Sequence, residues 1–513
     1  MPTTNTKRIA KNTLMLYTRM LLIMCVTLYT SRVVLSALGV VDFGIYNVVG
    51  GIVVMFSFLN GAMAQSTQRF LSYEIGRSNL ENLKNTFKTA LTIHILIALG
   101  VLILSETLGL WFLNCIMNIP EEHMSSANWV YQCSIISFVI SIIQVPFNAA
   151  IIARERMQIY AYMGILEVFL KLGIALLIPI ISFYDRLKIY AIFILIVTLI
   201  ICLIYQIYCT RHFKECVFEL TFRNGLFKTM SKYAAWNTVG NLAWVGKYQG
   251  SNLILNIFFG PAINAAYGIA GQVNVAVNNF VQNFSTAINP QIIKSYSAER
   301  FHDMERLIIY GAKISFFLIL IISFPILLST ERLLNIWLVE VPDYAVIFTQ
   351  LVIIDSIIES FSYSLGTGIQ ATGKIKWYQI IVGCTKLFNL PLSYIFLKLN
   401  YAPYSIFTIS IILSITMIFE RLLIIKVSLP YFSIKQFIRI VLFPAFMISA
   451  MCGIIYIGCL HLNFIHTLNI FIIPILAIIT ITITVLWCGF NKSERNTLYN
   501  FVRSKYNITT RNN

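Results

Sequence analysis

The sequence has few charged residues. They make up 12% of the 513 residues, whereas soluble proteins have about a quarter. Hydrophobic residues make up 58%, and the mean hydropathy is +0.78. Apolar runs of about 18 residues or more recur along the whole chain, which is the length that crosses a bilayer as a helix. The composition therefore predicts an all-α polytopic membrane protein.

Motifs for metal binding, disulfides and catalysis are also missing. The ten cysteines form no CxxC pair and most lie in apolar runs, so we interpret them as small core residues. There is no HExxH and no nucleophile elbow, and His94, His461 and His466 have no ligand partners at metal spacing. Residues 368–374 match part of a phosphate-binding loop, but Ile375 stands where that loop needs Ser or Thr. We predict no metal, no cofactor and no enzymatic activity.

The apolar runs predict about fourteen spans. Most of the 38 lysines and arginines fall between the spans on one side of the membrane, at both termini and in the loops after the even-numbered spans. Basic residues favour the cytoplasmic side, so both termini are predicted to be cytoplasmic. This topology and attraction to anionic lipids explain the net charge of +17 without nucleic acid. The predicted spans are 13–37, 43–66, 89–113, 127–151, 159–182, 188–209, 231–258, 264–288, 309–329, 344–369, 377–398, 403–426, 438–460 and 467–489.

The chain contains an internal repeat. Residues 39–51 align without gaps on residues 260–272, matching Gly39 with Gly260, Tyr46 with Tyr267 and Gly50 with Gly271. Helices 1–6 and 7–12 are therefore predicted to be equivalent six-helix lobes, related by a pseudo-twofold axis along the membrane normal. The predicted divisions are an N-lobe at 1–215, a C-lobe at 216–430, two additional helices at 431–490 and a basic cytoplasmic tail at 491–513.

The sequence resembles a known superfamily. ALGVVDFGIYNVVGG at 37–51 and QSTQRFLSYEIG at 65–76, with the two six-helix lobes, resemble the polysaccharide exporters of the MOP superfamily. The likeness extends over helices 1–12 and is nearest to Wzx-type flippases for O-antigen or capsule repeat units. The two additional helices are similar to those of fourteen-helix members. This resemblance implies alternating access that moves an undecaprenyl-pyrophosphate-linked oligosaccharide outward across the bacterial inner membrane. It also implies polysaccharide polymerase and glycosyltransferases as partners.

Several basic residues lie within the predicted spans, where charge is costly and is usually functional. We predict that they bind the pyrophosphate head group. Snorkelling is the alternative for Arg32, and a salt bridge to Glu167 is the alternative for Lys171. Arg19 and Lys247 have no acid nearby on their own helices. The head-group candidates are Arg19, Lys247, Lys171, Lys386 and Arg32.

Three intramembrane acids are candidates for coupling transport to H⁺ or Na⁺: Glu167, Asp355 and Glu359. Asp355 and Glu359 lie one turn apart on a helix. They could instead pair structurally with Lys386 or Lys313, and the sequence leaves both possibilities open.

A continuous polar face runs along the predicted helix 264–288, and a shorter one along 231–258. Amides suit sugar hydroxyls and aromatic rings suit sugar faces, so both faces are predicted to line a glycan cavity. Interhelical hydrogen bonding is the alternative. The candidates are Asn237, Asn241, Trp244, Tyr248, Tyr267, Asn274, Asn278, Gln282 and Asn289.

The predicted function is flipping of a lipid-linked oligosaccharide from the cytoplasmic to the outer leaflet. One alternative is a multidrug or cation antiporter of the same superfamily, which would require acidic residues in its cavity. A membrane-embedded glycan polymerase or ligase is a further alternative. Such an enzyme would require a sizeable outer loop or an acidic base near the outer surface, and Asp42 is the single candidate base in the first outside loop.

Overall fold

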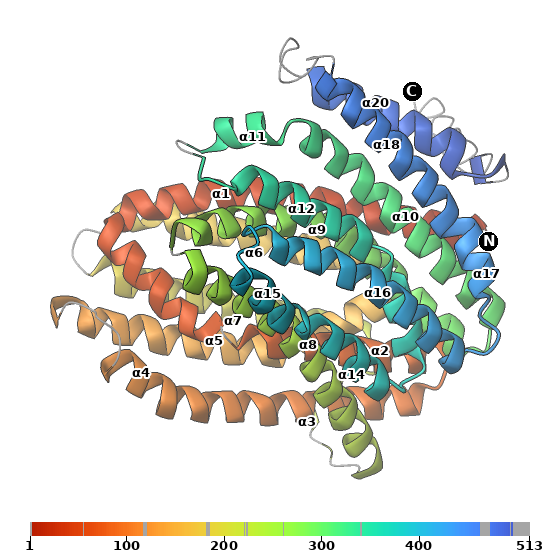
Figure 1. Ribbon diagram of the computed structural model, residues 1–513. Helices are drawn as coiled ribbons and strands as arrows, with labels where there is room; N and C mark the ends of the chain where they lie inside the picture. Colours follow the sequence, from red (N-terminus) through yellow and green to blue (C-terminus); the bar gives the residue numbers. More distant parts are fainter. Residues whose placement is uncertain are drawn as a thin grey trace, which may run out of the picture. The chain divides into compact units, whose positions relative to one another are not determined.

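The computed structural model describes residues 3–54, 56–115, 121–180, 185–219, 221, 224–259, 261–338, 341–461, 472–492 and 494–495. Within these ranges the regular elements are helices, and none is a strand (Figure 1). The predicted all-α class is therefore confirmed. Most of the predicted tail, 491–513, lies outside the described residues.

The helices of the first half are α1 (Thr3–Val54), α2 (Ser57–Gly76), α3 (Leu80–Leu104), η1 (Ser105–Gly109), α4 (Leu110–Cys115), α5 (Glu121–Ala153), α6 (Met157–Leu177), η2 (Ile178–Ile180) and α7 (Arg186–His212). The next are α8 (Asn224–Phe259), α9 (Pro261–Ser297), α10 (Phe301–Leu328), α11 (Thr330–Trp337), α12 (Ala345–Glu359), α13 (Ser362–Ala371), α14 (Lys376–Leu387) and α15 (Asn389–Lys398). The chain continues with α16 (Ser405–Ser428), α17 (Ile434–Phe437), η3 (Ile438–Leu442), α18 (Phe443–His461), α20 (Ile472–Thr484) and η4 (Val485–Gly489).

Ten helical segments of the described chain are long and apolar enough to cross a membrane. α8 and α9 are also long, but their polar faces make them less apolar than these ten segments. α20 with η4 supplies a shorter apolar helix. The fourteen predicted spans coincide with helical segments wherever they are described, so the predicted count is roughly consistent with the structure.

The first two predicted spans lie partly within the segment labelled α1. α1 runs through the predicted turn at 38–42, and Gly39 is the residue inside it that departs from helical geometry (φ 82°, ψ 170°). Glycine adopts this backbone conformation because it has no Cβ. The predicted turn is therefore a break at Gly39, where two helices meet within the segment labelled α1.

The chain divides into two compact units. We call Ala10–Leu242 with Ile293–Glu299 the N-unit, and Met1–Ile9, Ala243–Ile292 and Arg300–Asn513 the C-unit. In the N-unit, α5 packs on α2, α3 and α7 around buried Phe87 and Phe147. In the C-unit, α12 packs on α10 and α16, and Phe348 and Phe407 are in its core. The lobe boundaries predicted from the repeat stay a prediction.

The terminal helices of the C-unit form a separate layer on α10. α18, α20 and η3 pack against α10, and Figure 1 shows α18 and α20 in blue beside it. Phe437 is fully buried where this layer begins. The short helix α11, which follows α10, was not predicted.

Candidate functional site

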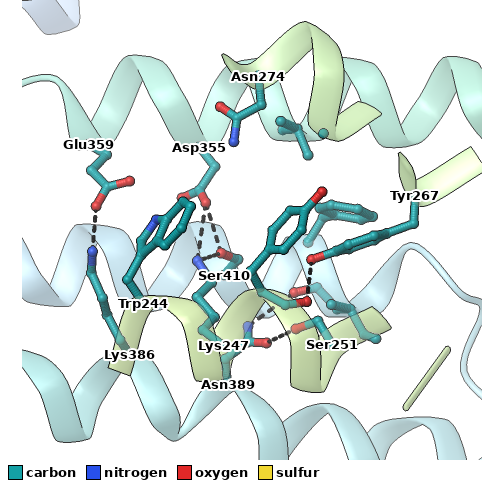
Figure 2. A pocket seen from close by; sticks show the side chains of 15 residues that line it. Trp244, Lys247, Ser251, Tyr267, Asn274, Asp355, Glu359, Lys386, Asn389 and Ser410 are labelled. Atoms are coloured by element: carbon teal, nitrogen blue, oxygen red, sulfur yellow. Dashed lines mark hydrogen bonds and ion pairs between the residues drawn. The ribbon is translucent and has the colours of Figure 1, made fainter. Parts of the chain in front are cut away.

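A cavity in the C-unit gathers several of the predicted site residues. Its water-accessible volume is about 70 Å³. α8 contributes aromatic and basic side chains, α12 contributes two acids, and α14 to α16 close the other side (Figure 2). The residues from the predicted set that line it are Trp244, Lys247, Tyr248, Tyr267, Asn274, Asp355, Glu359 and Lys386.

Asp355 forms the first ion pair of this cavity. The Lys247 ammonium lies 3.5 Å from an Asp355 carboxylate oxygen, and both side chains are mostly buried. Lys247 also donates to the Ser410 hydroxyl, which donates to Asp355 at 2.8 Å. The Ser414 hydroxyl donates to the other Asp355 oxygen. The sequence analysis missed Ser410 and Ser414, although their four-residue spacing places both on one face of α16.

Glu359 forms the second ion pair, one turn further along α12. The Lys386 ammonium donates to its carboxylate at 2.7 Å. Figure 2 shows both lysines directed at carboxylates of α12. The two lysines and two carboxylates together carry no net charge. The Glu359–Lys386 pair is one of the pairings that the sequence left open for the acids, whereas the Asp355–Lys247 pair was not predicted.

Aromatic side chains form a wall of the same cavity. The rings of Trp244 and Tyr248 stack with centroids 6.0 Å apart and planes 8° apart, and half of the Trp244 surface is exposed. The Tyr267 hydroxyl donates to the Tyr248 carbonyl at 3.0 Å. Gly271 lies against the Tyr248 hydroxyl, where a Cβ would collide with it. A flat, accessible aromatic face is suited to stacking on a sugar or another planar ring.

The polar face of α9 is used mainly for contacts between helices. Asn278 donates to the Ser356 hydroxyl at 3.0 Å, and Ser356 donates to Asn274 at 2.6 Å. Asn289 accepts from Thr367 at 2.9 Å. These bonds join α9 to α12 and α13, as the interhelical alternative predicted, while Asn274 also lines the cavity.

Three other predicted glycan contacts lie outside this cavity. Gln282 is exposed on α9. Asn237 and Asn241 belong to the N-unit, where Asn237 is buried and Asn241 donates to the Phe58 carbonyl at 3.3 Å. Their predicted role is not tested by these contacts.

The N-unit holds a second, larger cavity of about 510 Å³. Hydroxyl and amide groups dominate its polar lining, and Asn60 of α2 donates to Ser141 of α5 at 3.2 Å within it. The sequence analysis missed this lining, although its spacing of three and four residues indicates one helix face. The polar residues that α5 contributes are Ser134, Ser137, Ser141, Gln144 and Asn148.

Lys171 and Glu167 contribute the charges of the N-unit cavity. Their side chains lie 2.6 Å apart within α6 and are each 37% exposed. The salt bridge named as an alternative for Lys171 is therefore present. It cancels the charge of this lysine, as the pairs on α12 cancel those of Lys247 and Lys386.

The two arginines of α1 have different surroundings. The Arg19 guanidinium lies 4.3 Å from the centre of the Tyr160 ring and packs against Gly164 of α6. Its Nε is buried and has no hydrogen-bond partner, and no carboxylate of the described residues pairs with it. Arg32 is exposed.

No group of three or more metal-ligating side chains occurs in the described part of the chain.

Comparison with known proteins identifies this arrangement of helices. Residues 243–395, which include most of the C-unit cavity, match the MatE family model. The structure superposes on a crystal structure of MATE in the bent conformation with a TM-score of 0.67 at 13% identity, covering 83% of this chain and 98% of that one. The protein has the fold of the MATE transporters.

Two further solved structures share the MATE fold with this chain. One is an outward-facing multidrug resistance MATE family transporter, with a TM-score of 0.67, 14% identity, and coverage of 84% and 99%. The other is a MOP superfamily transporter from Pyrococcus furiosus described by a reversed polarity of its binding pocket, with a TM-score of 0.66, 15% identity, and coverage of 82% and 96%. None of the curated proteins compared with the chain matches it significantly.

Proposed function

We propose that this protein is an ion-coupled membrane transporter that works by alternating access. The observation that carries the proposal is the cavity in which Asp355 and Glu359 each bind one lysine. Ionisable side chains are costly among apolar helices, and they commonly mark ion and substrate paths. We further propose that the protein spans the bacterial inner membrane with both termini in the cytoplasm.

The paired carboxylates suggest how an ion could couple to a substrate. A proton on Asp355 would cancel its attraction for Lys247, and the lysine would then be available to an anionic substrate group. The same exchange applies to Glu359 and Lys386. The Lys171–Glu167 pair offers a third such switch in the N-unit. Proton or Na⁺ binding at the two carboxylates would thus favour binding of an anionic substrate group at the two lysines of the C-unit cavity.

The proposed substrate is an undecaprenyl-pyrophosphate-linked oligosaccharide, flipped toward the outer leaflet. Arg19 supports this substrate because no carboxylate among the described residues competes for its guanidinium, and arginine binds phosphate oxygens in a bidentate manner. The hydroxyl and amide lining of the N-unit cavity and the Trp244–Tyr248 face suit sugars. Polysaccharide polymerase and glycosyltransferases would be the functional partners.

A multidrug or cation antiporter is the second candidate. The comparisons support it better than the flippase, since one of the similar solved structures is a multidrug resistance transporter. A cationic substrate would require an excess of acid in its site, yet each carboxylate of the C-unit cavity is matched by a lysine. A proton on Asp355 or Glu359 would make this cavity more positive, which disfavours a cation further.

Transport in proteoliposomes distinguishes the two candidates. The wild-type chain and Arg19→Ala are reconstituted, and movement of a fluorescent lipid-linked oligosaccharide and of ethidium is measured separately. The flippase predicts oligosaccharide movement that falls about tenfold in Arg19→Ala, because one charge-assisted contact is lost. Arg211→Ala serves as the control and should behave as wild type, because Arg211 is exposed and lines neither cavity. Ethidium movement without oligosaccharide movement would instead establish the antiporter.

A further inference from the structure

The layer of terminal helices encloses a basic cavity that the proposed transport path does not use. It lies in the C-unit among α10, α17, η3 and η4, and its volume is about 500 Å³. Its charged lining in the described chain is Lys313, Lys435 and Arg439, without a carboxylate. The sequence predicts that this region is on the cytoplasmic side of the membrane.

Close packing holds η4 against α10 beside this cavity. Gly489 lies so near the Phe317 ring that an added Cβ would be 2.6 Å from it, and the Phe490 ring packs on Phe317 at 5.4 Å. This packing brings the chain after η4 onto α10, where Glu494 pairs with buried Lys313 at 2.8 Å. The Lys313 charge is therefore already neutralised.

Lys435 and Arg439 provide the available charge. They lie one turn apart, both side chains are exposed, and neither has an ion pair or side-chain hydrogen bond in the described part of the chain. Fully buried Phe437 lies between them in sequence and fixes this turn on the C-unit. The Ser433 hydroxyl caps the turn by accepting from the Gln436 amide at 3.2 Å. The two cations are thus held on an anchored turn.

Apolar surface continues from the cavity along both terminal helices. Phe446 and Ile454 of α18 and Trp487 of η4 are each more than two-thirds exposed. α20 adds exposed isoleucines along its length. A ligand with an anionic head and hydrocarbon chains would match both parts of this surface.

We propose that the cavity binds the phosphate group of an anionic membrane phospholipid. Lys435 and Arg439 would hold the phosphate oxygens, and the acyl chains would lie along the apolar faces of α18 and α20. The occupant is a lipid rather than free phosphate because the basic cavity opens beside exposed apolar helices. This site is separate from the ion pairs of α12, so its occupancy does not depend on the transported substrate.

Native mass spectrometry of the purified full chain tests the site. Delipidated protein is titrated with phosphatidylglycerol, with phosphatidylcholine, and with inorganic phosphate alone. The wild type should retain phosphatidylglycerol over phosphatidylcholine. K435Q/R439Q should bind phosphatidylglycerol about thirtyfold more weakly, since each basic residue contributes about 1 kcal/mol to binding an anionic lipid surface.

K228Q/K232Q is the matched control, because Lys228 and Lys232 are also exposed, basic and one turn apart. K228Q/K232Q should bind phosphatidylglycerol as the wild type does. K435R/R439K keeps both positive charges and should also retain binding. Circular dichroism checks that each variant is folded. Equal phosphatidylglycerol affinity in K435Q/R439Q and wild type would overturn the site. Binding of inorganic phosphate, but not phosphatidylglycerol, at Lys435 and Arg439 would overturn the lipid as its ligand.

Discussion

Asp355 forms an ion pair with Lys247 and accepts hydrogen bonds from Ser410 and Ser414. Two of them come from α16 and one from α8, so the carboxylate joins three helices. Without this carboxylate, the three partner side chains would lose a hydrogen-bond acceptor or counter-ion in a mostly buried site. The same residue can therefore support both the packing and the proposed ion coupling of the C-unit.

Asp355→Asn should lower the stability of the protein. The amide leaves the Lys247 ammonium without its carboxylate in a mostly buried site, which costs about 3 kcal/mol. A lower melting temperature in detergent would show this loss. K247M/D355L removes both charges and should recover most of it, since an apolar pair has no charge to leave unpaired. If Asp355→Asn and K247M/D355L melted at the same temperature, the ion pair would have no role in stability.

Gly164→Ala should impair transport without unfolding the protein. A Cβ at this position would lie 2.5 Å from the Arg19 Nε, so the guanidinium must leave the Tyr160 ring. The lost cation–π contact costs about 1 kcal/mol, and alanine returns a similar amount through its helix propensity. Transport in proteoliposomes should fall as in Arg19→Ala, with little change in melting temperature.

Gly173→Ala is the control on the same helix, since no atom lies within 4 Å of its added Cβ. It should transport as the wild type does and melt at the same or a higher temperature. Wild-type transport in Gly164→Ala would show that the contact between Arg19 and Tyr160 is not needed.

At the scale of the helices, one buried ion pair joins the chain after η4 to α10. Lys313 is 2% exposed, and Glu494 is the carboxylate that pairs with it. The Phe490 ring covers the ammonium at 5.1 Å. Loss of the carboxylate would leave a buried cation, which is a strongly unfavourable state.

Glu494→Gln should loosen α20 and η4. The unpaired Lys313 costs about 3 kcal/mol, and the chain can relieve this cost by separating η4 from α10. Compared with the wild type, amide hydrogen exchange should become faster in residues 472–489 and stay unchanged in α5. Glu331→Gln is the control, because Glu331 is exposed and forms no ion pair in the described chain. Unchanged exchange in Glu494→Gln would show that aromatic packing alone holds the layer.

Helix positions could be predicted because a membrane-spanning helix needs a long apolar run, and basic residues concentrate in the loops on one side of the membrane. Pairing between helices was not predictable, because Lys247 and Asp355 are 108 residues apart in the chain. The polar face of α9 was found by its spacing, but spacing does not tell whether Asn278 faces water or Ser356. The hydroxyls of α5 were missed because serine is small and common in membrane helices.

At the scale of the whole chain, the two units have different linings. The C-unit cavity is small and holds two ion pairs beside aromatic rings. The N-unit cavity is larger, and hydroxyls and amides dominate its polar lining around a single ion pair. The repeat at 39–51 and 260–272 thus preserves the turn and not the chemistry. This difference favours ion coupling in the C-unit and recognition of hydroxylated groups in the N-unit.

The most direct test of the account is the response of transport to an imposed pH gradient. Wild-type protein and D355N/E359Q are reconstituted in proteoliposomes, and movement of the transported substrate is followed with and without the gradient. The account predicts that the gradient changes the wild-type rate several-fold and leaves the rate of folded D355N/E359Q unchanged. An equal response of both proteins would contradict the assignment of Asp355 and Glu359 as the coupling groups.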